Sequence, residues 1–509
     1  MVVDLSALRP WYWRSLPLKA RTGSLIFNLL FRREPNQIAT LLESPYPPSI
    51  NNPQVNTRYS ICAGAPRSVN QHLQLWTPPV GEILPLLTRL LQRPTEDLKQ
   101  DEPQSYLPFT GGYLGWLGYD LAWEIERLPY LKTDSLPFPV AFWYEPESFA
   151  VLDHVQQILW LATSKVGDLD VLESRLEENK SQVGKSGGGA SPAPRKSQVK
   201  GGGENKSQVG KSGGGASPAP RKLQVKGGGE VDPRFLTSQA EYEGCVRQAQ
   251  EYIRAGDIFQ ANLSLRFAVE TAASGWEVYL ALQQINPSPF SSYWQTPWGS
   301  VISCSPERLV QLQKRQVTTR PIAGTRHLGL NSAQQLMQEL LTNPKERAEH
   351  IMLVDLERND LGRVCEWGSV TVDELLTIER YSHVMHLVSN IIGTLRLECN
   401  GIDLIRAVFP GGTISGCPKV RCLEIIEELE PLRRSLFYGS CGYLDWRGYL
   451  DLNILIRTLL LTPTAVSSKI VWGQVGAGIV ADSDPKKEWD ESLSKAQAQL
   501  AALKKLEAQ

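Results

Sequence analysis

The chain has 509 residues, of which 42% are hydrophobic and 21% charged, so it can bury one large core or two. Its 53 lysines and arginines nearly balance its 54 aspartates and glutamates, which excludes a global field that attracts nucleic acid or a membrane surface. The eight cysteines show no CxxC spacing, which disfavours zinc knuckles and a disulfide framework and favours a reducing cytoplasm.

The N-terminal residues, MVVDLSALRPWYWRSLPLKARTG, mix an acid with aromatic and basic residues and lack the order of a secretory signal. No stretch approaches the roughly 18 uninterrupted apolar residues that a membrane span needs. We therefore expect a cytoplasmic protein with no membrane and no nucleic-acid partner.

Strand patterns dominate the N-terminal region, residues 1–177. The runs 111–126 and 141–163 combine aromatic and β-branched residues with glycines, which is typical of strands joined by tight turns.

An insert at residues 178–230 separates the two halves of the chain. The run ENKSQVGKSGGGASPAPRKSQVKGGG occurs twice in tandem, with Leu223 replacing a serine in the second copy. Gly, Ser, Lys and Pro dominate it, so it cannot bury enough apolar surface to offset its ordering entropy. We expect a disordered linker or surface loop rather than a binding segment for its lysines.

The C-terminal region, residues 231–509, alternates between helix and strand patterns. Residues 238–256 have helical periodicity, whereas 257–269, 301–313 and 450–462 each read as a strand. The pattern predicts an α+β fold. It is too irregular for a doubly wound sheet, and neither GxGxxG nor GxxxxGK[ST] occurs where a nucleotide fold needs it.

Two pairs of glutamates stand three residues apart in helical patterns: Glu346 with Glu349, and Glu488 with Glu491. Such pairs are usually part of a solvated helix face, and the spacing alone favours that interpretation. If the two helices face one another, however, four carboxylates suit a hard cation such as Mg²⁺.

Glycine-rich turns at 320–326, 409–421 and 474–480 could each offer backbone N–H groups to an anion. The second leads into a helical pattern at 418–430, whose N-terminus would add a partial positive charge. A carboxylate and a phosphate both satisfy this physics, and ordinary tight turns explain each run alone.

His386 lies in the apolar run ERYSHVMHLVSNIIG. Periodicity alone favours a buried histidine with a satisfied hydrogen bond, since only a position in a cleft makes it an acid or base.

The motifs PIAGTR, HIMLVDLERND, ERYSHVMH, PGGTISGCPKVR, IRT, GAGIVADSDP and a final ExxE occur in this order between about residues 240 and 500. In order and spacing the chain resembles the chorismate-utilising enzymes: anthranilate synthase component I, aminodeoxychorismate synthase component I, and isochorismate or salicylate synthases. The resemblance implies a large β-sandwich-like core with helices on the outside, to which the N-terminal region contributes an intimate half.

The resemblance also implies roles for individual residues. The ligands of Mg²⁺, which grips the ring carboxylate of chorismate, are Glu346, Glu349, Glu488 and Glu491. The contacts to the ring carboxylate are Gly324, Thr325, Gly478 and Lys495, and those to the enolpyruvyl group are Tyr438, Arg457 and Gly476. The catalytic residues are Thr413, in a substrate loop, and His386, which is linked to elimination of pyruvate.

Ammonia needs a source, and the chain has no GxCxGxQ nucleophile elbow with a downstream His-x-Glu. The resemblance therefore implies that a separate glutamine amidotransferase subunit supplies it.

The sequence leaves two alternatives open for the product of the reaction. Ala323 stands where aminodeoxychorismate synthases typically carry lysine, which favours anthranilate synthase of tryptophan biosynthesis. The runs 286–294, 258–267 and 450–458 are more similar to the aminodeoxychorismate branch, whose product leads to para-aminobenzoate and folate. Because position 323 lies at the reacting carbon, we favour anthranilate.

Glu43 and Ser44, together with Pro289, Phe290 and Ser291, resemble the tryptophan pocket of the family. Phe290-Ser291 departs from the Tyr-Met usual in anthranilate synthases, and the LLES run could instead be a strand end that supports the sheet. An inactive homologue that senses tryptophan is a third hypothesis, against which the four glutamates and His386 argue.

Overall fold

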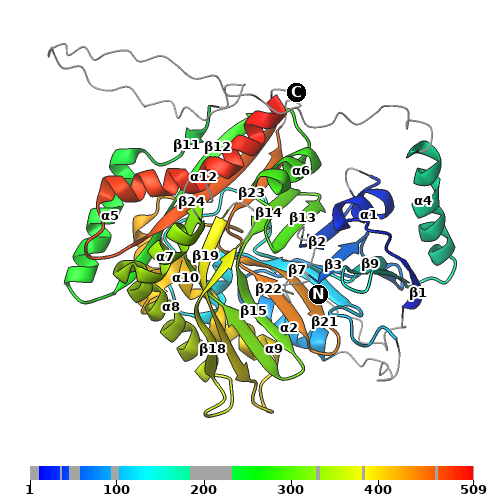
Figure 1. Ribbon diagram of the computed structural model, residues 1–509, viewed down its shortest axis with the longest axis horizontal. Helices are drawn as coiled ribbons and strands as arrows, with labels where there is room; N and C mark the ends of the chain where they lie inside the picture. Colours follow the sequence, from blue (N-terminus) through cyan, green and yellow to red (C-terminus); the bar gives the residue numbers. More distant parts are fainter. Residues whose placement is uncertain are drawn as a thin grey trace.

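The computed structural model describes residues 11–34, 37–44, 58–92, 103–183, 232–327, 333–380, 384–464 and 468–507. Within them the chain forms two large sheets whose strand pairings are antiparallel, with helices on the outside (Figure 1). The predicted α+β class and β-sandwich-like core are confirmed.

The first sheet has twelve strands and draws on both halves of the chain. In spatial order they are β1 (Tyr12–Pro17), β10 (Ile158–Thr163), β9 (Ser148–Asp153), β3 (Tyr59–Ala63), β2 (Ala39–Glu43), β13 (Phe290–Thr296), β14 (Gly299–Ser305), β23 (Thr458–Pro463), β24 (Lys469–Ile479), β12 (Gln260–Thr271) and β11 (Arg234–Phe235), with β20 (Gly416–Cys417) also paired to β12. Glu43 of β2 pairs with Ser291 of β13, which joins the N-terminal strands to the C-terminal ones.

The second sheet has ten strands and is also shared. In spatial order they are β17 (Ile322–His327), β19 (Val384–Thr394), β16 (Gln316–Arg320), β15 (Arg308–Gln313), β22 (Leu450–Asn453), β21 (Ser440–Asp445), β7 (Gly112–Leu117), β8 (Ala141–Tyr144) and β6 (Leu75–Trp76), with β18 (Thr371–Arg380) paired to β19. The strands β4 (Ser68–Val69) and β5 (His72–Leu73) form a separate ribbon.

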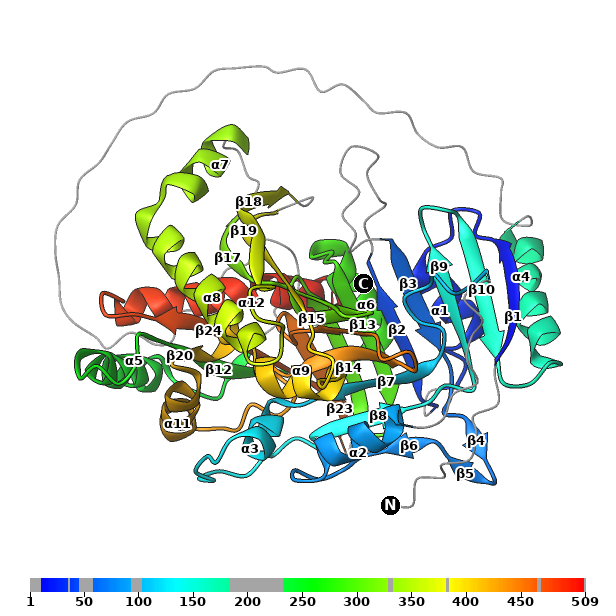
Figure 2. The same ribbon diagram turned by 90° about the horizontal axis from the view of Figure 1, so that it is seen from below.

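The described helices are α1 (Gly23–Leu30), α2 (Ile83–Leu91), α3 (Ala122–Ile125), α4 (Asp168–Val183), α5 (Gln239–Arg254), α6 (Gly275–Ile285), α7 (Ala333–Thr342), α8 (Pro344–Gly362), α9 (Gly401–Val408), α10 (Gly412–Ser415), α11 (Lys419–Leu429) and α12 (Pro485–Glu507), with a 3-10 turn η2 (Tyr119–Leu121). Ser238 and Ser274 start α5 and α6 with capping boxes, which satisfy N–H groups that a helix start leaves unpaired. The long C-terminal helix α12 packs along β24 and against α5 and α6 (Figures 1 and 2). None of the described helices is long and apolar enough to cross a membrane.

Two apolar clusters hold these layers together. Between the sheets, aromatic side chains from both of them pack against one another, including the fully buried Trp116, Trp143 and Trp294. On the other face of the twelve-stranded sheet, a second cluster includes Val246 of α5 and Leu500 of α12. The core therefore lies in two layers, one inside the sandwich and one beneath the outer helices.

Two runs that we predicted as single strands instead cross from one sheet to the other. Residues 301–313 form β14 and β15, which are separated at Pro306 and Glu307 and belong to different sheets. Residues 450–462 likewise form β22 and β23 with a break at 454–457. A period-two pattern is the same on both sides of such a crossing, so it could not reveal the break.

The boundaries 1–177, 178–230 and 231–509 remain a prediction. Helix α4 continues to Val183, and most of the insert, from residue 184 onward, lies outside the described residues. Since the flanking regions both contribute strands to both sheets, they form one folded body, and each layer of the sandwich is built from both predicted domains.

Candidate active site

One cavity of about 580 Å³ gathers nearly all the residues that we predicted for chemistry. Its walls come from β12, β17, β19, β24, α8, α10 and α12 and from the two crossings between the sheets. The predicted site residues that line it are Ala323, Gly324, Glu346, Glu349, His386, Thr413, Tyr438, Arg457, Gly476, Gly478, Glu488, Glu491 and Lys495. We call it the substrate cavity.

Thr325 is placed by its backbone alone. Its backbone pairs with that of His386 across β17 and β19, so it lies one strand away from the candidate acid or base. His386 is buried, with 6% of its surface exposed, and it faces the cavity. The structure thus favours a role in a cleft over that of an ordinary core histidine.

The α8 glutamates face strand glycines. A Cβ on Gly324 would lie 2.6 Å from Oε2 of Glu346, and one on Gly478 would lie 3.4 Å from Oε1 of Glu349. The Glu349 carboxylate also accepts a hydrogen bond from Nε2 of Gln260 at 3.1 Å. A side chain at Gly324 would therefore collide with the Glu346 carboxylate.

Helix α12 forms the opposite wall. Glu488 is buried, while Glu491 is more exposed and pairs with Lys495 at 2.9 Å. The Lys495 ammonium group also donates to the carbonyl of Gly476 at 2.9 Å. The carbonyl of Lys495 in turn accepts a hydrogen bond from Nη1 of Arg457, so the helix is bound to the crossing between β22 and β23.

All four glutamates thus line one cavity from two helices, and all offer the oxygen ligands that Mg²⁺ prefers. Within the described part of the chain, no three His, Cys, Asp or Glu side chains converge closely enough to hold a metal ion. The donor chemistry fits a hard divalent cation such as Mg²⁺.

Tyr438 and Arg457 meet at the floor of the cavity with left-handed backbone conformations. Their φ angles are +65° and +51°, which non-glycine residues rarely adopt, and the Tyr438 N–H donates to the carbonyl of Leu455 at 3.0 Å. Burial raises the pKa of the Tyr438 hydroxyl and lowers the pKa of the Arg457 guanidinium. The phenol therefore stays neutral as a hydrogen-bond donor, and the guanidinium can meet a carboxylate.

Comparison with known proteins assigns this arrangement to a family. The family described as chorismate binding enzyme matches residues 67–501. This chain belongs to that family. It is 56% identical over 507 residues to the anthranilate synthase component I-like protein of Synechocystis sp., covering 99% of this chain and 94% of that protein.

Two further proteins similar to this chain have different names. Aminodeoxychorismate synthase component 1 of Bacillus subtilis is 39% identical over 411 residues, which cover 80% of each chain. The crystal structure of anthranilate synthase component I from Streptococcus pneumoniae TIGR4 superposes with a TM-score of 0.66 at 30% identity, covering 87% of this chain and 92% of that one.

Glu307 also lines the substrate cavity of this chorismate-binding enzyme, although the sequence did not point to it. It is buried in the crossing between β14 and β15, and burial raises its pKa to about 8, with the nearby Thr413 side chain opposing the shift. The carboxyl is therefore protonated at neutral pH and can donate a proton into the cavity. A proline followed by an acid inside a strand pattern, at Pro306-Glu307, was the available signal.

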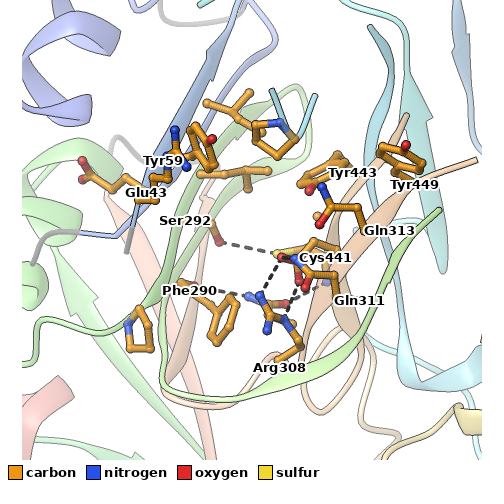
Figure 3. A pocket seen from close by; sticks show the side chains of 18 of the residues that line it. Glu43, Tyr59, Phe290, Ser292, Arg308, Gln311, Gln313, Cys441, Tyr443 and Tyr449 are labelled. Atoms are coloured by element: carbon orange, nitrogen blue, oxygen red, sulfur yellow. Dashed lines mark hydrogen bonds and ion pairs between the residues drawn. The ribbon is translucent and has the colours of Figure 1, made fainter. Parts of the chain in front are cut away.

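A second cavity, of about 300 Å³, lies on the other side of the β13 start (Figure 3). The predicted tryptophan-pocket residues Glu43, Pro289, Phe290 and Ser291 line it, whereas Ser44 is buried outside it. Pro289 lines the substrate cavity as well.

Glu43 is engaged by structural contacts. Its carboxylate accepts hydrogen bonds from the hydroxyl of Ser24 at 2.5 Å, from the hydroxyl of Tyr279 at 2.6 Å, and from Gln283. Burial raises its pKa. In Figure 3 this carboxylate points away from the group of Phe290 and Arg308. These contacts favour the interpretation of Glu43 as a strand end that supports α1 and α6.

Proposed function

We propose that this chain is component I of an anthranilate synthase, which adds ammonia to chorismate and eliminates pyruvate. The observation that carries the proposal is Ala323, which lies in the wall of the substrate cavity and offers no amine. Among the described residues that line this cavity, Lys495 is the one lysine, and its ammonium group is engaged by Glu491 and Gly476. With no lysine to attack the ring, a ring carbon stays open to ammonia.

Substrate binding follows from the charges of the walls. Arg457, with the neutral hydroxyl of Tyr438 and the backbone of Gly476, offers donors to the enolpyruvyl carboxylate. Gly324, Thr325, Gly478 and Lys495 are our proposed contacts for the ring carboxylate.

Glu346, Glu349, Glu488 and Glu491 would hold Mg²⁺. Their four negative charges would otherwise repel a substrate with two carboxylates, so a cation is needed for binding. When bound, Mg²⁺ supplies positive charge that binds and polarises the ring carboxylate.

Buried residues carry out the proton transfers of the reaction. As ammonia attacks the ring, the ring hydroxyl leaves as water when it takes the proton of Glu307. The Thr413 side chain lies near that carboxyl. His386 then assists the loss of pyruvate, which aromatises the ring.

The second candidate is aminodeoxychorismate synthase component I, for which the 39% identity to the Bacillus subtilis enzyme is the supporting observation. It would release 4-amino-4-deoxychorismate, and a separate lyase would be needed to form para-aminobenzoate. For either product, we propose that a separate glutamine amidotransferase subunit supplies the ammonia. We also propose that the second cavity takes tryptophan, with Pro289 as the residue common to both cavities.

Replacing His386 by methionine tests the anthranilate proposal. Amination would continue while elimination loses its acid or base, so 2-amino-2-deoxyisochorismate should accumulate and the anthranilate rate should fall by roughly 10²-fold or more. Chromatography of the products with time gives both quantities. A His386→Met enzyme that forms anthranilate at the wild-type rate, with no intermediate, would remove His386 from the mechanism.

A further inference from the structure

A buried ion pair lies directly beneath the substrate cavity. Arg434 donates to Glu430 twice, from Nε at 3.0 Å and from Nη2 at 2.6 Å. The side chains of both residues are almost fully buried, with 1% and 5% exposed. A bidentate pair of this kind is rigid, but its desolvation makes it a poor source of stability in itself.

The same guanidinium also holds three parts of the cavity floor. Nη1 donates to the carbonyl of Ile414 at 2.8 Å, and Nη2 donates to the carbonyl of Asn262 at 2.6 Å. The guanidinium carbon lies 4.7 Å from the ring centroid of Tyr438. Ile414, Asn262 and Tyr438 all line the substrate cavity, although they come from α10, β12 and the segment before β21.

Asn262 extends this arrangement to a proposed catalytic residue. Its side-chain Nδ2 donates to the carbonyl of Thr413 at 3.1 Å. The carbonyls of two successive residues, Thr413 and Ile414, are therefore both held from below, one by Asn262 and the other by Arg434. This fixes the peptide that carries the Thr413 side chain near Glu307.

Glu430 connects the pair to β12, the strand beside the one that carries Gly476 and Gly478. Its Oε1 accepts hydrogen bonds from the N–H of Ser264 at 2.7 Å and from the Ser264 hydroxyl at 2.8 Å. Ser264 of β12 pairs with Gly476 of β24, one of the proposed enolpyruvyl contacts. The ion pair thus lies behind the wall that receives the enolpyruvyl group.

We propose that Arg434 is a positioning residue for chorismate, which fixes the Thr413 segment and the Tyr438 ring against β12 from beneath the cavity. The inference rests on the proposed use of this cavity for chorismate and does not depend on which aminated product forms. Arginine is required because its planar fork serves a carboxylate and two carbonyls at once, whereas a lysine ammonium is a single point donor.

Arg433 supplies a matched control. It is the adjacent residue and is equally buried, but it contacts Asp120 at 3.2 Å and the rings of Trp123 and Tyr130, none of which lines the substrate cavity. Both arginines would lose a guanidinium on substitution by lysine. A difference between the two variants therefore reports on the cavity rather than on burial.

The test is steady-state kinetics of the full chain with Mg²⁺ and ammonium. Arg434→Lys should raise the KM for chorismate on the order of 100-fold, because the groups that receive the substrate lose their alignment, and should leave the KM for ammonium unchanged. Arg433→Lys should change neither KM. A loss of folded enzyme would lower kcat alone, so an unchanged chorismate KM in Arg434→Lys, or an equal rise in Arg433→Lys, would overturn the proposal.

A second variant covers the case in which Arg434→Lys does not fold. Glu430→Gln keeps the acceptor for Ser264 but removes the charge that orients Arg434, so the chorismate KM should rise on the order of 10-fold. A folded Glu430→Gln enzyme with the wild-type KM would contradict the inference.

Direct binding separates this inference from the proposed function. If the wild-type chain fails to aminate chorismate, the proposed function is wrong, and calorimetric titration of chorismate in Mg²⁺ still compares Arg434→Lys, or Glu430→Gln, with wild type. Weaker binding by the variant alone would support the positioning role, and equal binding would refute it.

Discussion

Replacing Glu307 by glutamine is expected to lower kcat by roughly 10²–10⁴-fold, because an amide cannot give a proton to the departing hydroxyl. Glu307 is a buried carboxyl of the substrate cavity, and the pKa of about 8 makes it an acid at neutral pH. Glutamine has nearly the same shape, so the packing of the cavity wall should be preserved. The measurement is kcat with ammonium at saturating chorismate.

The dependence of turnover on pH identifies the ionisable group that the substitution removes. At a fixed concentration of free ammonia, wild-type turnover should fall as the pH rises through about 8, because Glu307 ionises there. Glu307→Gln should retain only slow turnover, and that turnover should not fall as the pH rises. Asp120→Asn is the control, since the pKa of Asp120 is raised by burial to about 7 but the residue lies outside the cavity. If the turnover of Glu307→Gln still fell with rising pH as it does in wild type, the acid would be a group other than Glu307.

The dependence of the protein's stability on pH reports the pKa of Glu307 independently of turnover. Glu307 is neutral in the folded protein up to about pH 8 but ionises in the unfolded chain near its ordinary value of 4.5. Its contribution to stability is therefore present below pH 4.5 and is lost as the pH rises through 8. The melting temperature of Glu307→Gln should match wild type at low pH and exceed it increasingly toward pH 8.

The second large effect is expected from the metal ligands. Glu349→Gln and Glu491→Gln should each lower kcat/KM by about a thousandfold or more at limiting Mg²⁺, because each removes one charge from a hard-cation site. The two side chains lie on α8 and α12, on facing walls of the cavity. Titration of activity with Mg²⁺ should show partial recovery at high concentration.

Asp490→Asn is the matched control for Glu491→Gln, because Asp490 is the neighbouring exposed acid on α12 and does not line the cavity. It should keep the wild-type dependence on Mg²⁺. Wild-type activity that persists in excess EDTA would show that these glutamates do not hold a metal needed for turnover.

Helical spacing alone was a weak guide to this site, since it favoured a solvated helix face. Glu346 with Glu349 and Glu488 with Glu491 were predicted to share helix faces, and α8 and α12 do present them to one cavity. Spacing could not show that the helices face each other, since that depends on sheets assembled from strands far apart in the chain. Motif order supplied what periodicity lacked.

Residues at the crossings between the sheets were harder to predict. Glu307 was missed because it lies where the chain leaves one sheet for the other, and a hydrophobic alternation continues across that point; Arg457, at the other crossing, was identified only through the family resemblance. Arg434 was missed for a different reason. In the run EELEPLRR a buried arginine cannot be told from a solvated one, because burial is decided by β12 and α10, which pack over it.

The central claim is that this chain makes anthranilate, and the most direct test is product analysis with the purified chain, chorismate, Mg²⁺ and ammonium. Chromatographic separation of the two aminobenzoates, with the fluorescence of anthranilate as detection, distinguishes the outcomes. With Ala323 in the cavity wall and His386 facing the substrate, anthranilate should form with no added lyase. Release of 4-amino-4-deoxychorismate, converted to para-aminobenzoate only when a lyase is added, would contradict the account.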